Sequence, residues 1–182
     1  MSIASIDKNA PKYYPFMIIQ RQIIPRKNKL VKIDPIDAKI IMALQDNADR
    51  PAEVIGDLVG LSRNACWKRM KSLEAQGILK HRIMLANAQA LGYNLTVFIH
   101  VKTNDHSRGW NDIFMRAIAT IPQIQKAYRM SGDLDYLLQA IVPDIGAYDD
   151  MYQELTRRVP LSDVSASFVM EEIKNTTVLP LQ

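Results

Sequence analysis

Four side chains between positions 63 and 68 have the chemistry to contact a nucleic acid. Arg63 and Lys68 are cations, Asn64 carries an amide, and Trp67 offers a flat apolar surface. Asn64, Trp67 and Lys68 are spaced so that a helix would place them on one face. Cations gain affinity from phosphates through counterion release, whereas an amide or an aromatic ring can contact base edges or thymine methyl groups. The spacing therefore predicts a DNA-facing surface.

The same stretch also carries a packing stripe. Cys66, Met70 and Leu73 recur at helical spacing on another face, as expected of a helix that covers an apolar core. Ser62 is placed to cap the helix, whose first amide groups could hold a phosphate. The predicted DNA-contacting residues are Ser62, Arg63, Asn64, Trp67, Lys68, Arg69 and Lys71. A solvated basic helix in an unrelated helical core is the alternative.

The elements before this helix complete a helix-turn-helix layout. Asp34 followed by Pro35 predicts a helix start, and apolar residues continue the helical period to about Asn47. Pro51 opens a second short helix that Gly60 ends, and the third helix runs over 63–76 after a short turn. In the stretch 78–85 apolar and polar residues alternate imperfectly, which predicts a strand or a wing.

The charge is distributed unevenly. Residues 1–32 hold seven basic residues and one acidic residue, and residues 62–86 hold six basic and one acidic. The intervening 33–61 and the stretch 87–182 are net acidic. Residues 1–32 contain three prolines, and their apolar residues follow neither a helical nor a strand period. We therefore expect an irregular basic arm that could lie along phosphates. The alternatives are that this segment is a solvated, flexible extension, or that translation begins at Met17 and part of the segment is not in the protein.

Composition excludes several classes of protein. A single cysteine, Cys66, permits no intramolecular disulfide or zinc cluster, and its place on the packing stripe predicts a buried apolar residue rather than a thiol switch. Apolar runs of about seven residues are too short to span a bilayer, and no secretory signal is recognised. The histidines lack partners at metal-binding spacings, and no paired carboxylates, nucleophile and base, or phosphate loop appear. We therefore expect a cytoplasmic protein without membrane contact, metal, cofactor or catalytic residues.

The second half alternates strands and helices. Strand-like runs cover 93–102, 124–130, 134–142 and 164–173, and helical spacing covers 110–121 and 145–160. This order predicts a ferredoxin-like βαββαβ domain whose free sheet face pairs with a second copy. The predicted fold class is α+β: a basic arm at 1–32, a winged or simple helix-turn-helix domain at 33–86, and the ferredoxin-like domain at 87–182.

Three groups of residues carry a family resemblance over roughly 34–182. They are Val59-Gly60-Leu61-Ser62 with Cys66, Arg69, Leu73-Glu74 and Gly77-Ile78; Ser131-Gly132-Asp133-Leu134-Asp135-Tyr136-Leu137-Leu138; and Val169-Met170-Glu171-Glu172. Together they resemble the Lrp/AsnC family of transcription regulators. The resemblance implies binding to double-stranded DNA, dimers that assemble further, and an amino acid bound between dimers. Arg63, Asn64 and Ala65 depart from the commonest opening of the family's recognition helix, so the resemblance does not identify the operator.

The resemblance also implies an effector site. The family's effector loop corresponds to Ser131, Gly132, Asp133 and Asp135, preceded by Arg129, where loop amides and an arginine suit a carboxylate and an aspartate suits an ammonium group. Thr103, His106 and Trp110 are further pocket candidates, with a loop and helix-cap role as the alternative. Several stretches, Cys66 to Arg69 and Tyr128 to Gly132 among them, are similar to a cysteine-sensing subgroup, which makes cysteine one expected effector.

Two other functions remain open from the residues alone. Siroheme decarboxylases resemble the same family, so an enzyme on this architecture is conceivable, although the basic face of the third helix argues against it. An architectural protein that wraps DNA without a ligand is the other alternative.

Overall fold

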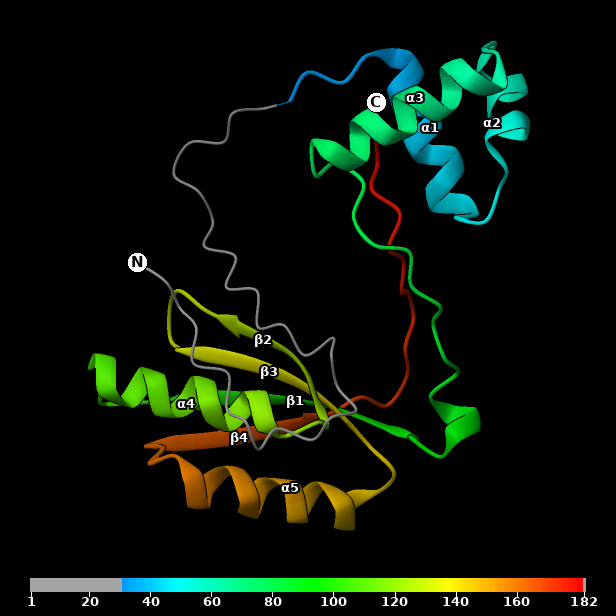
Figure 1. Ribbon diagram of the computed structural model, residues 1–182. Helices are drawn as coiled ribbons and strands as arrows, with labels where there is room; N and C mark the ends of the chain where they lie inside the picture. The colour runs from blue at the N-terminus through cyan, green and yellow to red at the C-terminus, as the bar shows by residue number, and fades with distance from the viewer. Residues whose placement is uncertain (1–30, 182) are drawn as a thin grey trace. The chain divides into compact units, whose positions relative to one another are not determined.

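The computed structural model describes residues 31–181, which form two compact units (Figure 1). Residues 31–86 and 173–181 belong to a helical unit, and residues 87–172 belong to a sheet unit. The predicted basic arm falls on residues 1–32, of which 1–30 lie outside the described residues. The predicted second domain extended to residue 182, whereas the contacts of 173–181 are with the helices.

The helical unit contains three helices, as predicted. They are α1 (Pro35–Asp46), α2 (Ala52–Val59) and α3 (Arg63–Ala75). Asp34 caps α1 by accepting a hydrogen bond from the backbone N–H of Asp37, and Ser62 caps α3 by accepting from that of Ala65. These bonds satisfy amide groups that have no partner within the helix, which explains why the helices begin at these residues.

Glycines end α2 and α3. Gly60 and Gly77 adopt positive φ values of 72° and 70°, in the left-handed region that glycine enters without strain. After Gly77, the N–H of Ile78 donates to the carbonyl of Leu73 at 3.0 Å and that of Gly77 to the carbonyl of Glu74 at 2.9 Å. This Schellman arrangement turns the chain away from α3.

A core holds the helical unit together. Its buried members come from α1, α2 and α3: Ile40, Ile41, Leu44, Ile55, Cys66, Met70 and Leu73. The predicted stripe of α3 is therefore confirmed as its packing face. Gly56 of α2 is also buried, and a Cβ atom there would lie 2.6 Å from the carbonyl oxygen of Leu61. Glycine thus allows the turn between α2 and α3 to approach the α2 backbone.

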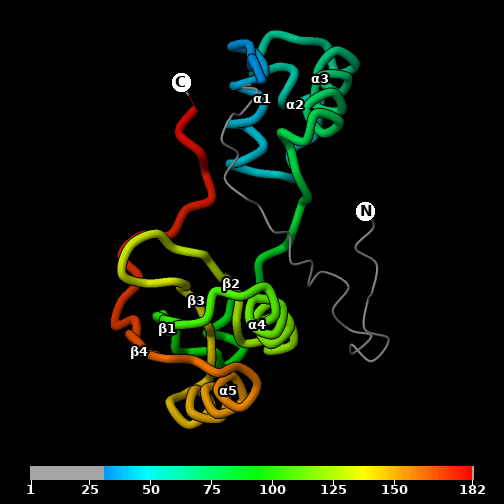
Figure 2. The backbone as a smooth tube through the Cα atoms, turned by 90° about the vertical axis from the view of Figure 1, so that its left-hand side faces the viewer, coloured from blue at the N-terminus to red at the C-terminus, as the bar shows by residue number. Residues whose placement is uncertain are grey.

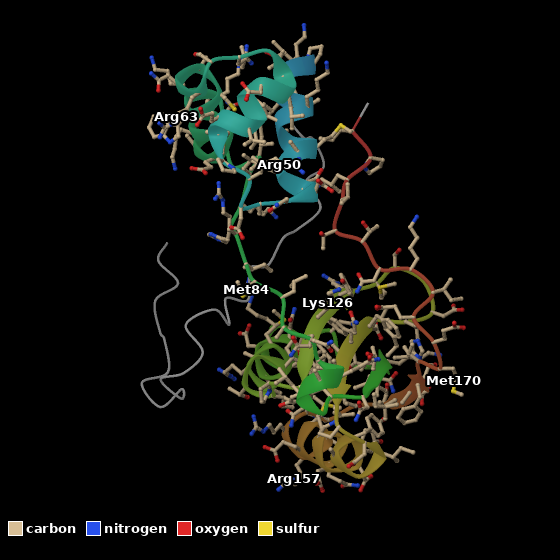
Figure 3. All side chains as sticks on the ribbon, turned by 90° about the vertical axis from the view of Figure 1, so that its right-hand side faces the viewer. Arg50, Arg63, Met84, Lys126, Arg157 and Met170 are labelled. Carbon is tan, nitrogen blue, oxygen red and sulfur yellow. The ribbon has the colours of Figure 1, made fainter. Side chains whose placement is uncertain are left out.

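The predicted strand or wing at 78–85 is wrong. These residues adopt no helix or strand, and Ile83, Met84 and Leu85 are exposed (Figure 3). Their alternation is imperfect, and an isolated strand needs a neighbouring strand to form its hydrogen bonds. A short 3₁₀ turn (Gln89–Leu91) then precedes the sheet unit.

The sheet unit has the predicted βαββαβ order. Its elements are β1 (Leu95–Lys102), α4 (Arg108–Thr120), β2 (Ile124–Arg129), β3 (Tyr136–Val142), α5 (Ile145–Arg158) and β4 (Asp163–Phe168). The strands lie in the order β2-β3-β1-β4 and every neighbouring pair is antiparallel. The prediction of a ferredoxin-like sheet is confirmed. The last strand is shorter than the predicted 164–173, because the pairing with β1 ends at Phe168.

Both helices of the sheet unit cover one face of the sheet (Figure 2). Alternate residues of β1 and β3, including Val97, Ile99 and Leu138, are fully buried against α4 and α5. Their neighbours Phe98, Leu137 and Ile141 point to the opposite face, because side chains alternate along a strand, and they are only partly buried. The opposite face therefore offers apolar side chains that no helix of the unit covers.

No helix among the described residues combines the length and the apolar content needed to cross a membrane.

Replacing Gly56 with alanine should destabilise the helical unit by about 1–3 kcal/mol, because the added methyl group overlaps the Leu61 carbonyl. Hydrogen exchange of the α2 and α3 amides in the full chain would measure the loss. Gly109→Ala in α4 is the matched control, since its Cβ would meet nothing closer than the Ser107 Oγ at 3.9 Å. Equal protection in the Gly56→Ala variant and the unchanged protein would contradict this role for Gly56.

Candidate nucleic-acid interface and effector loop

The outer face of α3 carries the predicted DNA-contacting residues. Arg63, Asn64, Trp67 and Lys68 are exposed, and no hydrogen bond or ion pair joins their side chains to other described residues. Trp67 is 52% exposed, which is unusual for an indole that could have packed into a core. Figure 3 shows the Arg63 side chain at the surface of the helical unit. This face can therefore offer two cations, an amide and an aromatic ring to a partner.

Arg69 differs from these four residues. Its Nη1 atom lies 2.6 Å from Oδ2 of Asp34 and 2.8 Å from Oδ1 of Asp37, so that the guanidinium joins α3 to the start of α1. The two carboxylates raise the pKa of Arg69. The backbone N–H of Asp37, followed by the Arg69 guanidinium, holds the pKa of Asp34 below its usual value. Arg69 was predicted to contact DNA; in the structure its Nη1 atom is paired with two carboxylates of the same unit.

Ser62 and Lys71 are exposed but already make contacts. The Ser62 hydroxyl accepts from the backbone N–H of Ala65 at 3.3 Å, which is its capping role. Lys71 Nζ lies 2.6 Å from Oε2 of Glu74 on the next turn of α3. An exposed pair of this kind is weak, so Lys71 remains available to a stronger partner.

Cys66 is fully buried in the core of the helical unit. Burial raises the pKa of its thiol, because the thiolate would lose its hydration. The described residues also contain no group of three or more histidine, cysteine, aspartate or glutamate side chains placed to bind a metal ion. Cys66 is thus a packing residue, as its position on the stripe predicts.

The predicted effector loop joins β2 to β3. Gly132 has a φ of 109°, which side chains disfavour, and the backbone N–H of Met130 donates to the carbonyl of Asp135 at 2.8 Å across the loop. Arg129, Ser131, Gly132 and Asp133 are all exposed. The carboxylate of Asp133 has no hydrogen bond or ion pair among the described residues, so the loop tip presents a free charge.

Asp135 anchors this loop to the end of β1. Its Oδ2 atom accepts from the backbone N–H of Thr103 at 2.9 Å, and its own N–H donates to the carbonyl of Val101 at 3.1 Å. Nδ1 of His106 lies 3.9 Å from Oδ1 of Asp135. The fold therefore brings Asp135 to Thr103 and His106, which lie about thirty residues earlier in the sequence, at one end of the sheet.

Thr103 and Trp110 are held inside the unit. Thr103 is buried, and its hydroxyl bonds the backbone of Asp105. Trp110 is 3% exposed, stacks on Phe114 at a centroid distance of 5.1 Å, and donates its indole N–H to the carbonyl of Pro160 at 2.7 Å. His106, at 63% side-chain exposure, is the member of the predicted pocket set that lies open to solvent beside the loop. The geometry gives Thr103 and Trp110 supporting positions.

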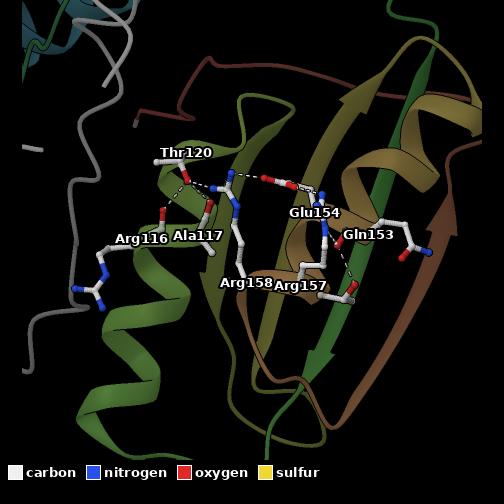
Figure 4. Close-up of polar contacts among 8 residues, drawn as sticks. Arg116, Ala117, Thr120, Gln153, Glu154, Arg157 and Arg158 are labelled. Atoms are coloured by element: carbon white, nitrogen blue, oxygen red, sulfur yellow. Dashed lines mark hydrogen bonds and ion pairs between the residues drawn. The ribbon is translucent and has the colours of Figure 1, made fainter. Parts of the chain in front are cut away.

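Two shallow hollows that the sequence did not indicate lie where α4 and α5 end. Arg158 and Thr120 line both of them. Arg158 donates to the Thr120 hydroxyl and pairs with Glu154, which also pairs with Arg157 (Figure 4). Glu154 offsets only part of the charge of these two arginines, and Arg116 adds a further cation to the lining of the first hollow.

Comparison with known proteins agrees with this geometry. A family model for the AsnC-type helix-turn-helix domain matches residues 33–74, and one for the Lrp/AsnC ligand binding domain matches residues 96–179. The chain belongs to the Lrp/AsnC family. The resemblance inferred from the residues is therefore confirmed. The members of this family are transcription regulators.

Relatives of this Lrp/AsnC chain are similar over most of their length. It is 43% identical over 150 residues to the glutamate uptake regulatory protein of Zymomonas mobilis, covering 82% of the chain and 92% of the relative. It is 38% identical over 151 residues to the DNA-binding transcriptional activator DecR of Escherichia coli, covering 82% and 99%. A solved structure of a Neisseria meningitidis transcriptional regulator in complex with L-Met matches with a TM-score of 0.78 at 30% identity, covering 82% and 97%. The relatives are named as regulators rather than as enzymes.

Acid should destabilise the helical unit of this Lrp/AsnC chain partly through Asp34. Because folding lowers the pKa of Asp34, its contribution is present above the usual aspartate pKa of about 3.9 and is lost as the pH falls through the lower folded value. Asp34→Asn keeps a capping side chain but removes the charge, so the stability of this variant should depend less steeply on pH in the acid range below about pH 5. Exchange of the α1 amides against pH would show this, and an unchanged slope would contradict it.

Cys66 should react slowly with a thiol reagent in the folded chain and rapidly after unfolding, because the thiol is buried and its pKa is raised. Timed reaction with Ellman's reagent reports this thiol alone, since the chain has one cysteine. Fast modification of the native protein would place Cys66 at an accessible surface instead.

Proposed function

We propose that this chain is a sequence-specific DNA-binding regulator of amino-acid metabolism whose activity responds to a small amino acid. The observation that carries the proposal is the exposed face of α3, where four residues suited to phosphates and base edges make no hydrogen bond or ion pair with other described residues. A helix that follows the turn of a helix-turn-helix is the one that enters the major groove. The names of the relatives support the same class of function.

The residues of α3 divide into two roles in this proposal. Arg63 and Lys68 supply affinity through phosphates, together with the capped N-terminus of α3 at Ser62 and a smaller contribution from Lys71. Asn64 can make two hydrogen bonds to an adenine edge, and Trp67 can contact a thymine methyl group. Arg69 acts indirectly, because its ion pairs fix α3 against α1.

The effector is proposed to bind at the loop between β2 and β3. The carboxylate of Asp133 can receive an ammonium group, while Arg129 and the loop amides can receive a carboxylate. Asp135 and Thr103 hold the loop in place, and His106 borders it. The L-Met complex of the Neisseria relative supports an amino acid as the ligand class, and cysteine remains one candidate among several.

The uncovered sheet face is proposed to form the dimer interface. Phe98, Leu137 and Ile141 leave apolar surface that a second copy would bury. Further association of dimers would bring effector loops of different dimers together and place the amino acid between them. Binding regulates the protein if the ligand prefers one assembly over another.

DNA binding should become weaker with increasing salt, and each phosphate contact should contribute about one unit to the slope of log affinity against log salt. Lys68→Ala should therefore reduce that slope by about one when measured on DNA from upstream of the protein's own gene. Lys39→Ala removes the same charge from an exposed position on α1 and serves as the control. Absence of binding at low salt, or equal slopes for both variants, would contradict the assigned interface.

A thermal-shift panel of the twenty amino acids, with cysteine under reducing conditions, should identify the effector. A ligand at about a hundred times its Kd stabilises the folded state by about 2.7 kcal/mol. Asp133→Asn should abolish the shift, whereas Asp112→Asn, an exposed carboxylate on α4, should preserve it. If no amino acid raises the melting temperature and DNA still binds, the protein is a ligand-independent DNA-coating protein instead.

A further inference from the structure

The end of the chain contacts the helical unit. Residues 173–181 follow β4 and the sheet unit in sequence, yet their contacts group them with α1, α2 and α3. Leu181 is partly buried and packs against the core of the helical unit, and Nε2 of Gln45 in α1 donates to the carbonyl of Thr177 at 3.4 Å. Figure 1 shows that the C-terminal end of this segment lies near α1 and α3.

The apolar residues of this tail differ in their contact with the helical unit. Leu181 turns toward the core, whereas Leu179 is 62% exposed and Val178 47% exposed. Two local hydrogen bonds shape the segment, from the N–H of Leu181 to the carbonyl of Leu179 at 3.0 Å and from the N–H of Val178 to the Thr176 hydroxyl at 3.2 Å. Two leucines of the same tail thus lie in different environments.

The side-chain amide of Gln45 in α1 is partly enclosed by the protein. Its Oε1 atom is buried and has no hydrogen-bond partner among the described residues. The Gln45 residue as a whole is only partly buried. A buried amide oxygen without a partner is costly, so it is tolerated only where neighbouring contacts stabilise the arrangement. The Leu181 contact and the Gln45 to Thr177 hydrogen bond are such contacts.

We propose that residues 173–181 are an integral part of the DNA-binding unit, in which the tail packs on α1 and stabilises the three helices. Short domains bury a smaller fraction of their surface and are marginally stable, so one additional leucine in a small core has a measurable effect. The tail follows β4 in the sequence. The stabilising role stands on the contacts alone, whereas any consequence for DNA affinity rests on the proposed function.

The test compares two leucines of the full-length chain by hydrogen exchange of the α1 amides. Leu181→Glu would place a charge against the apolar core, and it should accelerate exchange around Ile40, Ile41 and Leu44 by about tenfold or more. Leu179→Glu adds the same charge at an exposed position of the same tail and should leave exchange unchanged. Equal exchange in both variants would overturn the proposal.

Gln45 provides an independent pair of variants. Gln45→Glu replaces the donor to Thr177 with a charged acceptor and should accelerate α1 exchange, whereas Gln45→Met removes the orphaned oxygen and should keep the tail bound. Protection of the sheet strands should stay constant in all four variants, which separates tail release from general misfolding. If Gln45→Glu leaves α1 as protected as Gln45→Met does, the tail does not dock there. This readout requires no DNA, so a failure of the proposed DNA-binding function would be seen separately.

Discussion

The approach of the turn after α2 to Gly56 is the constraint on which the DNA-facing surface depends. The Leu61 carbonyl lies where any side chain at position 56 would stand, and the N–H of Leu61 donates to the Gly56 carbonyl at 2.8 Å. This contact sets where Ser62 caps α3, and therefore which residues of α3 point outward. The stripe of Cys66, Met70 and Leu73 then fills the core behind the turn. The packing face and the proposed recognition face therefore lie on two sides of one helix.

A comparable constraint organises the other unit at the end of its sheet. The hydrogen bond from the Thr103 N–H to the Asp135 carboxylate joins the exit of β1 to the entry of β3. It holds the base of the loop while the tip, at Ser131, Gly132 and Asp133, stays exposed. Residues that resembled ligand contacts in the sequence thus divide into a supporting set and an accessible set. The proposed effector contacts therefore belong to the accessible set, with His106 beside it.

Charge alone was a poor guide to which cations are free. Arg69 lies among Arg63, Lys68 and Lys71 in the sequence, and its residue type suits phosphate equally well. In the fold its Nη1 atom contacts two aspartates, Asp34 before α1 and Asp37 in its first turn. A net charge counts all four cations equally, whereas the tertiary contacts show that Arg69 forms ion pairs within the helical unit and that Arg63 and Lys68 form none with other described residues.

The sequence by itself determined the elements that local patterns encode. Capping residues, glycines at positive φ and apolar periods of 3.6 or 2 act over a few residues, so the helices α1 to α3 and the βαββαβ order were predictable, as was the family from its motifs. Tertiary structure decided what depends on distant partners. Residues 78–85 do not pair with any strand of the described residues, so the imperfect alternation of apolar and polar residues there was not enough to predict a strand. Trp110 became a core residue because Phe114, Tyr136 and Pro160 surround it. The tail joined the helical unit for the same reason, since the contact of Leu181 with a core formed more than a hundred residues earlier leaves no local signal in the sequence.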